Sequence, residues 1–299
     1  MKQSKIILFL SAFFTLGFTS CLKEHQMNID PSKSTSLVAF ENSGSNVAGA
    51  SSVYPGYYKD LGTLTNGQSS TFNINVGYSG TEAAPEDITV NFALDTAVLA
   101  TYNAQNGTNY IVPAADVFSF PASVVIKKGE RMAQTQVKIS VTDNFKFEDA
   151  YALPLAITSA SNSSISSNFG KAVYSFGVRN IYDGHYSLKG YTLRAADAVK
   201  TGNFVRSSGM DLQTVGATAV QFAELQVWAD LTGVGVGNPV ISVNPDNTVT
   251  LSSDGGIMNA PGYNSHYEPD TKTFYISFTW GAGPSARLAT DTLTYSGPR

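Results

Sequence analysis

The sequence predicts an all-β protein, with an N-terminal immunoglobulin-like β-sandwich followed by a C-terminal antiparallel β-barrel or a second sandwich. Short runs alternate apolar and polar side chains, which is typical of half-buried antiparallel strands. Glycine, asparagine and proline separate these runs, as expected for turns. Charged residues make up 14% of the chain, so Ser, Thr, Asn and Gly provide most of the surface polarity, and the 42% hydrophobic content is enough for real cores.

The first residues resemble a bacterial lipoprotein signal peptide. A basic start with Lys2 and Lys5 precedes an apolar run at 6–18, and the chain's only cysteine, Cys21, follows two small residues. The apolar run is too short for a membrane-spanning helix of roughly 20 residues. The resemblance implies that residues 1–20 are removed, that the Cys21 sulfur takes a diacylglycerol, and that its new amino terminus takes a third acyl chain. Three acyl chains would make the membrane attachment effectively permanent.

Residues 21–35 show no hydrophobic periodicity, which predicts a flexible tether between the lipidated cysteine and the folded part. Lys23-Glu24 resembles the surface-export signal of Bacteroidetes lipoproteins. We therefore expect a lipid-anchored protein of the outer membrane that is exposed at the cell surface. Two folded domains are expected beyond the tether, at 36–180 and 181–299.

Strands with a period of two fill most of residues 36–180. In Thr71–Tyr78 the apolar residues Phe72, Ile74 and Val76 share one face, and asparagines occupy the other. Further strands are predicted at 88–94, 124–126, 134–141, 152–157 and 172–178. Many short strands joined by Gly, Asn and Pro turns favour a sandwich of immunoglobulin type.

One helix is predicted between these strands. Asp95 is a suitable N-cap, and Val98, Leu99 and Tyr102 fall on one helical face. Asn106-Gly107 supplies a left-handed stop.

Three blocks of sequence stand out around the helix: SGTEAAPEDITVNFALDTAVLATYNAQNGTNYIVP, then VVIKKGE, then YALPLAIT. With these blocks, residues 36–180 resemble an N-terminal β-sandwich domain of Bacteroidetes surface lipoproteins. That domain is of unknown function. Its relatives occur beside glycan-degrading enzymes or before glycan-binding modules in polysaccharide-utilisation systems. The resemblance therefore implies a surface protein of such a system.

Residues 181–299 predict a second set of strands. Their expected ranges are 184–194, 218–230, 240–243, 248–251, 273–280 and 288–295, and Asn244-Pro245-Asp246-Asn247 is a strong hairpin signal. So many consecutive strands suit an up-and-down barrel or a second sandwich. YDGHYSLKGY, YEPDTKTFYISFTW and ARLATDTLTYSGPR resemble the C-terminal β-domains of the same lipoproteins.

Several classes of function are disfavoured by the sequence. The net charge of −4 provides no basic face for nucleic acid. The three histidines lack metal-ligand spacing, no second cysteine completes a site, and no catalytic motif stands out. The glycines of 233–237 are out of register for a dinucleotide-binding loop, because Asn238-Pro239 follows them instead of a helix. We therefore expect no catalytic residue, no metal and no cofactor.

Sugar binding is the chemistry that the polar and aromatic residues favour. A sugar offers apolar C–H faces to an aromatic ring and hydroxyl groups to polar side chains. Alternation in the run 218–230 places Trp228 with Glu224, Gln226 and Asp230 on the polar face of a strand. Such a tryptophan is either a ligand platform or a lid over a cross-strand pair. Trp280, in contrast, shares a face with apolar residues and is predicted to be core.

A second candidate group lies in the loop after Pro261-Gly262. Tyr263, Asn264, His266 and Tyr267 combine aromatic rings with hydrogen-bonding groups. They predict either part of a glycan-binding surface or ordinary turn packing.

Three functions follow from these patterns. The leading hypothesis is a non-catalytic surface lipoprotein that binds an oligo- or polysaccharide and works with an outer-membrane importer and its companion lipoproteins. The first alternative is a structural subunit of a fimbria or adhesin, since those Bacteroidetes proteins are also lipidated and built of two β-domains. The second is a glycosidase accessory protein or a weak glycoside hydrolase.

Overall fold

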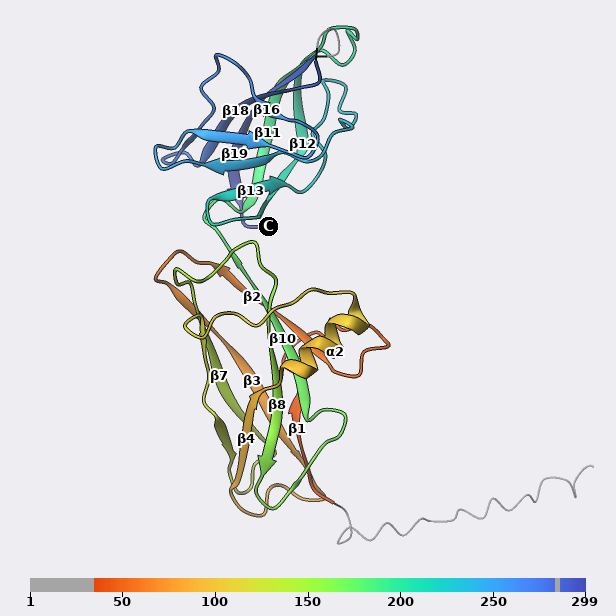
Figure 1. Cartoon of the computed structure of the whole chain (residues 1–299), viewed down its shortest axis with the longest axis vertical. Coiled ribbons are helices and arrows are strands. Elements are labelled where there is room, and N and C mark those ends of the chain that lie inside the picture. The colour runs from red at the N-terminus through yellow and green to blue at the C-terminus, as the bar shows by residue number, and fades with distance from the viewer. Residues whose placement is uncertain (1–34, 283–285) are drawn as a thin grey trace, which may run out of the picture. The chain divides into compact units, whose positions relative to one another are not determined.

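The structure is a computed structural model that describes residues 35–282 and 286–299 (Figure 1). The expected signal peptide at 1–20, the expected lipidation site Cys21 and the tether up to residue 34 lie outside the described residues. In the part of the chain that is described, no helix combines the length and apolar character needed to cross a membrane.

The first domain contains two five-stranded sheets that share one hydrophobic core. The first sheet has the order β5-β7-β3-β1-β9 and is built of β1 (Leu37–Glu41), β3 (Ser69–Ser79), β5 (Phe118–Ser119), β7 (Met132–Ser140) and β9 (Ser164–Ile165). The second has the order β2-β10-β8-β4-β6 and is built of β2 (Gly56–Thr63), β4 (Ile88–Leu94), β6 (Ser123–Ile126), β8 (Tyr151–Ala160) and β10 (Lys171–Arg179).

The predicted alternation explains how the two sheets pack. In β4, Ile88, Val90 and Phe92 are buried while the residues between them are exposed. Tyr174 of β10 is fully buried and packs against Phe40 of β1, with ring centroids 6.1 Å apart. Each sheet thus contributes one apolar face to the core, and the predicted β-sandwich is confirmed.

Helix α2 (Thr96–Asn106) confirms the predicted helix and its ends. The Asp95 side chain accepts hydrogen bonds from the backbone amides of Ala97 and Val98, at 3.1 and 3.4 Å. Gly107 ends the helix with φ of 64°, a left-handed conformation that glycine adopts without steric cost. The apolar face of α2 packs against β8 and β10, on a smaller core cluster of its own.

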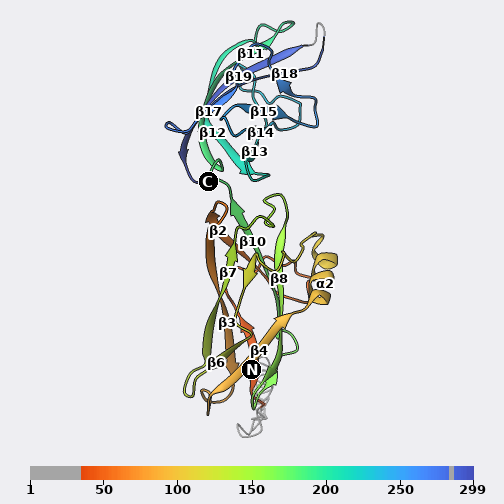
Figure 2. The same ribbon diagram turned by 60° about the vertical axis from the view of Figure 1, so that its left-hand side comes forward.

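The second domain is one antiparallel sheet of nine strands that curls into a nearly closed barrel (Figures 1 and 2). Its order is β15-β14-β13-β12-β11-β19-β18-β16, and β17 also pairs with β18. The strands are β11 (Gly184–Arg194), β12 (Gly202–Thr214), β13 (Ala219–Phe222), β14 (Val240–Val243), β15 (Val249–Ser252), β16 (Met258–Asn259), β17 (His266–Glu268), β18 (Thr273–Trp280) and β19 (Arg287–Gly297). Of the two architectures expected here, the barrel is confirmed.

The Asn259 side chain bridges the two ends of this sheet. Its amide accepts a hydrogen bond from the Leu251 backbone at 2.7 Å and donates one to the Val249 carbonyl, also at 2.7 Å. These bonds join β16 to β15 where the regular ladder is missing. One side chain therefore satisfies backbone groups that an open edge would leave unpaired.

Two strands of the second domain depart clearly from the sequence prediction. The strand expected over 218–230 ends at Phe222, because the chain then folds into a tight loop with Leu231 at φ of 62°. Strand β12 was not predicted, because Arg206-Ser207-Ser208-Gly209 has the composition of a turn. Gly209 has φ of 65° and the β11–β12 register shifts nearby, so the turn-like residues form a bulge within a continuous strand.

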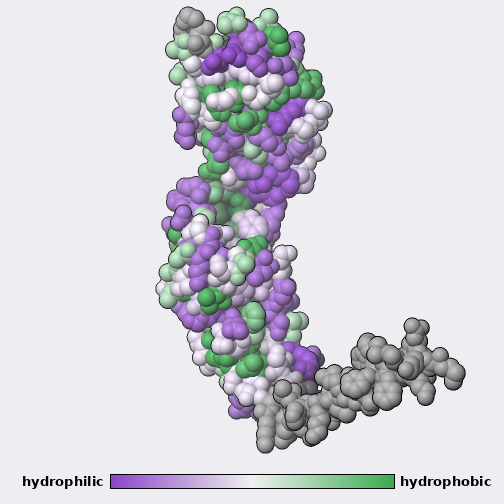
Figure 3. All heavy atoms as spheres, turned by 90° about the vertical axis from the view of Figure 1, so that its right-hand side faces the viewer, coloured by the Kyte–Doolittle hydropathy of each residue, from purple (hydrophilic) through white to green (hydrophobic). Residues whose placement is uncertain are grey.

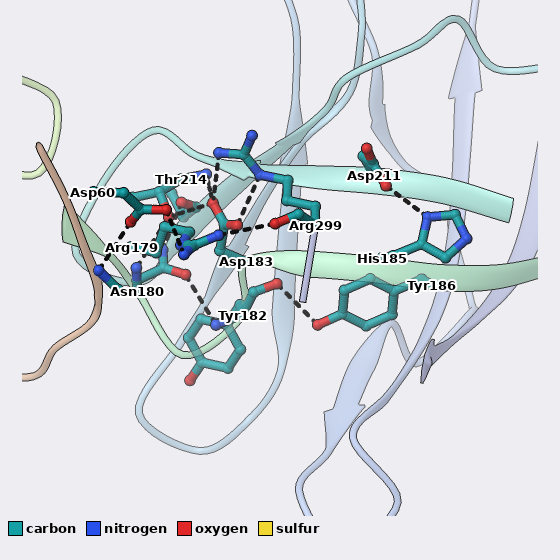
Figure 4. Close-up of polar contacts among 12 residues, drawn as sticks. Asp60, Arg179, Asn180, Tyr182, Asp183, His185, Tyr186, Asp211, Thr214 and Arg299 are labelled. Carbon is teal, nitrogen blue, oxygen red and sulfur yellow. Dashed lines mark hydrogen bonds and ion pairs between the residues drawn. The ribbon is translucent and has the colours of Figure 1, made fainter. Parts of the chain in front are cut away.

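A buried carboxylate ties together three points of the barrel domain (Figure 4). Asp183, just before β11, has a fully buried side chain. It accepts hydrogen bonds from the Thr214 backbone amide at 2.7 Å and the Thr214 hydroxyl at 2.9 Å. Arg299 Nε donates to the same carboxylate at 2.8 Å. The Asp183 carboxylate therefore links the start of β11 to the end of β12 and to Arg299.

The surface is mixed in character. On the face shown in Figure 3, hydrophobic residues lie in small groups among hydrophilic ones instead of forming one continuous patch.

Candidate ligand-binding site

The site is built at one end of the barrel, where three neighbouring strands place side chains in a row. Arg194 of β11 lies directly opposite Arg287 of β19, and Arg287 lies opposite Trp280 of β18. Alternation along β19 puts Arg287 on the same face as the buried Ala289 and Leu293, toward the barrel interior. The row therefore stands at the mouth of the barrel core.

The loop after β13 adds a second tryptophan. The Trp228 amide donates to the Thr232 carbonyl at 2.8 Å, and the Val234 amide donates to the Gln226 carbonyl at 2.7 Å. This loop turns the Trp228 ring inward, onto the ring of Trp280 at a centroid distance of 5.4 Å. The Arg194 guanidinium lies 5.7 Å from the Trp228 ring centroid, within the range of a cation–π contact.

These side chains border a cavity of about 300 Å³. Its walls are Arg194, Lys200, Trp228, Trp280, Arg287 and the segment 233–236. The glycines of that segment, which do not fit a nucleotide-binding loop, here form one wall of the cavity. The cavity thus combines three cationic side chains with two aromatic rings.

Two carboxylates stand beside the cations, outside the cavity wall. Asp197 Oδ2 lies 3.6 Å from Arg194 Nη1, and Asp230 Oδ2 lies 3.2 Å from Lys200 Nζ. The hydroxyl and amide of Thr232, together with Lys200, hold the pKa of Asp230 below its ordinary value, so this carboxylate is charged at neutral pH.

A buried polar pair lies in the barrel interior. Gln226 Nε2 donates to Asp291 Oδ1 at 3.1 Å, and both residues are at most 2% exposed. Burial raises the pKa of the Asp291 carboxyl from 3.8 to about 8, and the Gln226 hydrogen bond opposes that change. Asp291 Oδ2 and Gln226 Oε1 have no hydrogen-bond partner among the described residues. Protonation turns one Asp291 carboxyl oxygen into a hydrogen-bond donor. A donor is the partner that the two buried oxygens, Asp291 Oδ2 and Gln226 Oε1, lack among the described residues.

The structure corrects the expected placement of the first candidate group. Trp228 is only 5% exposed and lies beyond the end of β13, so its predicted position on the polar face of a strand is wrong. Gln226 is buried as well, because the loop that replaces the strand turns both side chains into the core.

Glu224 is exposed and lies 3.4 Å from Arg206, on the outside. Asp230 lies beside Lys200, next to the cavity. Of this group, the structure places only Trp228 in the cavity wall.

The second candidate group is divided between surface and core. Tyr263 is 39% exposed and Asn264 is exposed, whereas Tyr267 is 6% exposed and packs in the core. The His266 ring stacks on Tyr275 at a centroid distance of 5.1 Å. None of the four lines the cavity, so the structure does not bring the two candidate groups together there.

Other residues of the site were missed by sequence reasoning. Arg194, Lys200 and Arg287 come from separate segments, and no local motif unites them. The burial of Asp291 could have been predicted, because it alternates with Ala289 and Leu293 on the apolar face of a strand. The prediction that Trp280 is core is confirmed, with 3% exposure.

Metal binding is not indicated by the described residues. Within 35–282 and 286–299, no group of three or more His, Cys, Asp or Glu side chains is placed to hold an ion.

Two family models match consecutive parts of the chain. Residues 39–164 match a family model described as an N-terminal domain, and residues 170–294 match one described as a C-terminal domain. No curated protein matches the chain by sequence.

Two solved structures share the fold, and a third is less similar. A protein of unknown function from Bacteroides ovatus has a TM-score of 0.56 at 15% identity, covering 88% of this chain and 95% of its own. A second such protein from Bacteroides ovatus has a TM-score of 0.50 at 16% identity, with 86% and 94% covered. An auxiliary nutrient binding protein from Bacteroides thetaiotaomicron has a TM-score of 0.45 at 15% identity, with 79% and 90% covered.

Proposed function

We propose that this chain, which carries the N-terminal and C-terminal domains of those two families, is a non-catalytic glycan-binding lipoprotein of the bacterial surface. The observation that carries the proposal is the cavity at the barrel mouth, where two tryptophans meet three side chains rich in N–H donors. Cys21 would hold the protein at the outer membrane, beside an importer and its companion lipoproteins.

The cavity has the chemistry that sugars require. Guanidinium and ammonium groups donate hydrogen bonds to hydroxyl oxygens, and indole rings pack against the C–H faces of a pyranose. A volume of about 300 Å³ is at the lower end of the range for small-molecule sites, and matches one sugar residue better than a long chain. Trp228 and Trp280 are almost fully covered, so a sugar would meet the edges of their rings.

The composition of the wall favours binding over hydrolysis. A glycosidase needs two carboxyl groups that face the scissile bond from opposite sides. The residues that line this cavity are cationic, aromatic or small, and none is acidic. The site is therefore better suited to holding a sugar than to cleaving a glycosidic bond.

A variant that fills the cavity tests the proposal. Gly235 lines it, and a Cβ there would have no atom within 4 Å, so Gly235→Leu adds a side chain at the cavity wall without a clash at its Cβ. Gly297→Leu is a matched control, because Gly297 is equally open and lies at the end of β19 away from Arg287. Trp228→Ala is less suitable, since removing a buried tryptophan costs about 3–5 kcal/mol of stability.

The measurement is retention of soluble residues 22–299 in gels that contain host or plant polysaccharides. We expect at least one polysaccharide to retard the unmodified protein and the Gly297→Leu control. The same polysaccharide should not retard Gly235→Leu. If no polysaccharide retards the protein, the proposed function is wrong. If Gly235→Leu is retarded as strongly as the control, the glycan binds elsewhere.

A further inference from the structure

The cavity wall contains two arginines that stand at directly opposed positions of neighbouring strands. Arg194 and Arg287 are directly opposite in the antiparallel pair β11–β19, on its inward face. Like charges at directly opposed positions destabilise a sheet. The arrangement therefore carries a cost in the ligand-free protein that an anion between the two side chains would remove.

The neighbouring carboxylates compensate only part of the positive charge. Arg194 has Asp197 at 3.6 Å, and Lys200 has Asp230 at 3.2 Å. Among residues 35–282 and 286–299, no carboxylate lies within 4.0 Å of the Arg287 side chain. Three cations thus face two carboxylates, and the cation left over is Arg287.

Asp291 does not fill this role. It lies on the same face of β19 as Arg287, with Ala289 between them, and it is fully buried in the interior. Its carboxyl is engaged by Gln226, and burial raises its pKa to about 8, which keeps it uncharged at neutral pH. The Arg194–Arg287 pair is therefore open to an anion from outside.

We propose that the cavity binds the acidic residue of a glycan, with a carboxylate or sulfate group held between the guanidinium groups of Arg194 and Arg287. This inference rests on the proposed function, since it names the class of sugar that the same cavity takes. Planar guanidinium groups match the paired oxygens of a carboxylate or sulfate, and such charge-assisted bonds are stronger than bonds between neutral groups. The indole edges of Trp228 and Trp280 would then contact the sugar ring that carries the anion.

Nonspecific attraction does not account for such binding. The chain has a net charge of −4, so its surface as a whole repels polyanions, and any affinity for an acidic glycan must come from a local site. Lys189 offers a matched control for local charge, because it is exposed on β11 at an outward position, on the opposite face from Arg194.

The test is titration calorimetry on residues 22–299 with paired glycans that differ in one acidic group. Polygalacturonate against its methyl ester tests a carboxylate. Chondroitin sulfate against chondroitin, which keeps the uronate carboxylate, tests a sulfate. Neutral galactan and mannan complete the panel. We expect polygalacturonate or chondroitin sulfate to bind, and the partner without the recognised acidic group to bind about tenfold more weakly or worse. Raising the salt concentration should weaken that binding.

Variants of Arg287 test where the acidic group of the glycan binds. Arg287→Gln should lower the affinity for the charged glycan by about tenfold or more, Arg287→Lys by less, and Lys189→Gln should change it little. In the ligand-free protein, Arg287→Gln should leave the thermal midpoint unchanged or raise it, because a like-charge contact is removed.

The outcomes separate the two proposals. If neutral glycans bind as tightly as acidic ones, or if Arg287→Gln binds the acidic glycan like the unmodified protein, the acidic-sugar inference is overturned and glycan binding stands. If neither class binds, the proposed function fails and the inference fails with it.

Discussion

Asp291 accepts a hydrogen bond from the Gln226 side-chain amide at 3.1 Å, inside the barrel and away from any opposite charge among the described residues. The fold keeps this carboxyl neutral by burying it, and its pKa is raised from 3.8 to about 8. A buried carboxyl of this kind reduces stability at pH values above its unfolded pKa.

Asp291→Asn should remove a pH dependence of stability. Between the unfolded pKa of 3.8 and the folded pKa of about 8, the unfolded chain has released a proton that the folded protein retains. The free energy of unfolding therefore falls as pH rises through this window, by an amount on the order of a few kcal/mol. An asparagine amide can both donate to and accept from Gln226, so the variant should lack this decline.

Urea unfolding at pH 4.5, 6 and 8 measures the difference. Both tryptophans lie in the barrel domain, so their emission reports its unfolding. The difference in stability between Asp291→Asn and the unmodified protein should grow with pH. A constant difference would mean that Asp291 is charged in the folded state throughout this range.

Two ion pairs of equal length differ in how far the carboxylate is buried. Asp183–Arg299 and Asp87–Lys127 both have N–O distances of 2.8 Å, but the Asp183 side chain is fully buried and that of Asp87 is 52% exposed. Arg299→Ala should cost about 3–5 kcal/mol, because it leaves a buried carboxylate with two neutral donors. Lys127→Ala should change stability little, because exposed pairs contribute little.

Thermal unfolding of the two variants tests this contrast. A similar loss in both would show that burial does not determine the strength of these pairs.

The Asn259 bridge should contribute to barrel closure. Asn259→Ala removes two hydrogen bonds of 2.7 Å and leaves the Leu251 amide and the Val249 carbonyl without partners. We expect a loss of about 1–3 kcal/mol, with faster amide hydrogen exchange at Leu251 than in the sheet centre. Unchanged exchange at Leu251 would show that other contacts close the barrel.

Cys21 is predicted to be the lipid attachment site. Cys21→Ser should abolish incorporation of labelled palmitate and move the protein from the membrane fraction to the soluble fraction. Ser34→Ala, in the expected tether, should leave both unchanged. Labelled palmitate in Cys21→Ser would contradict the prediction.

Local sequence patterns predicted most of the fold, because period-two alternation and turn residues act over a few neighbours. Strand Ile88–Leu94, helix Thr96–Asn106 with its Asp95 cap, and the Asn244–Asn247 hairpin are all present in the structure. The prediction for Trp228 is wrong, because its alternation with Gln226 and Asp230 indicates a strand, whereas the strand ends at Phe222 and a loop follows.

The binding site itself was beyond local patterns. Arg194 and Arg287 are far apart in the sequence and meet only through the register of β11 with β19. Register is set by the whole sheet, including a shift near the start of β11. The segments that carry the cations therefore look like ordinary strand ends in the sequence.

Glycan binding in the cavity is tested most directly through the chain's two tryptophans, which both line the cavity. Excited selectively, they report only on this site. Titration with the glycan that binds in calorimetry should change their emission saturably, with the same dissociation constant, and Gly235→Leu should show no change. If the glycan binds in calorimetry while the tryptophan emission stays constant, it binds elsewhere, and the proposed binding in the cavity is wrong.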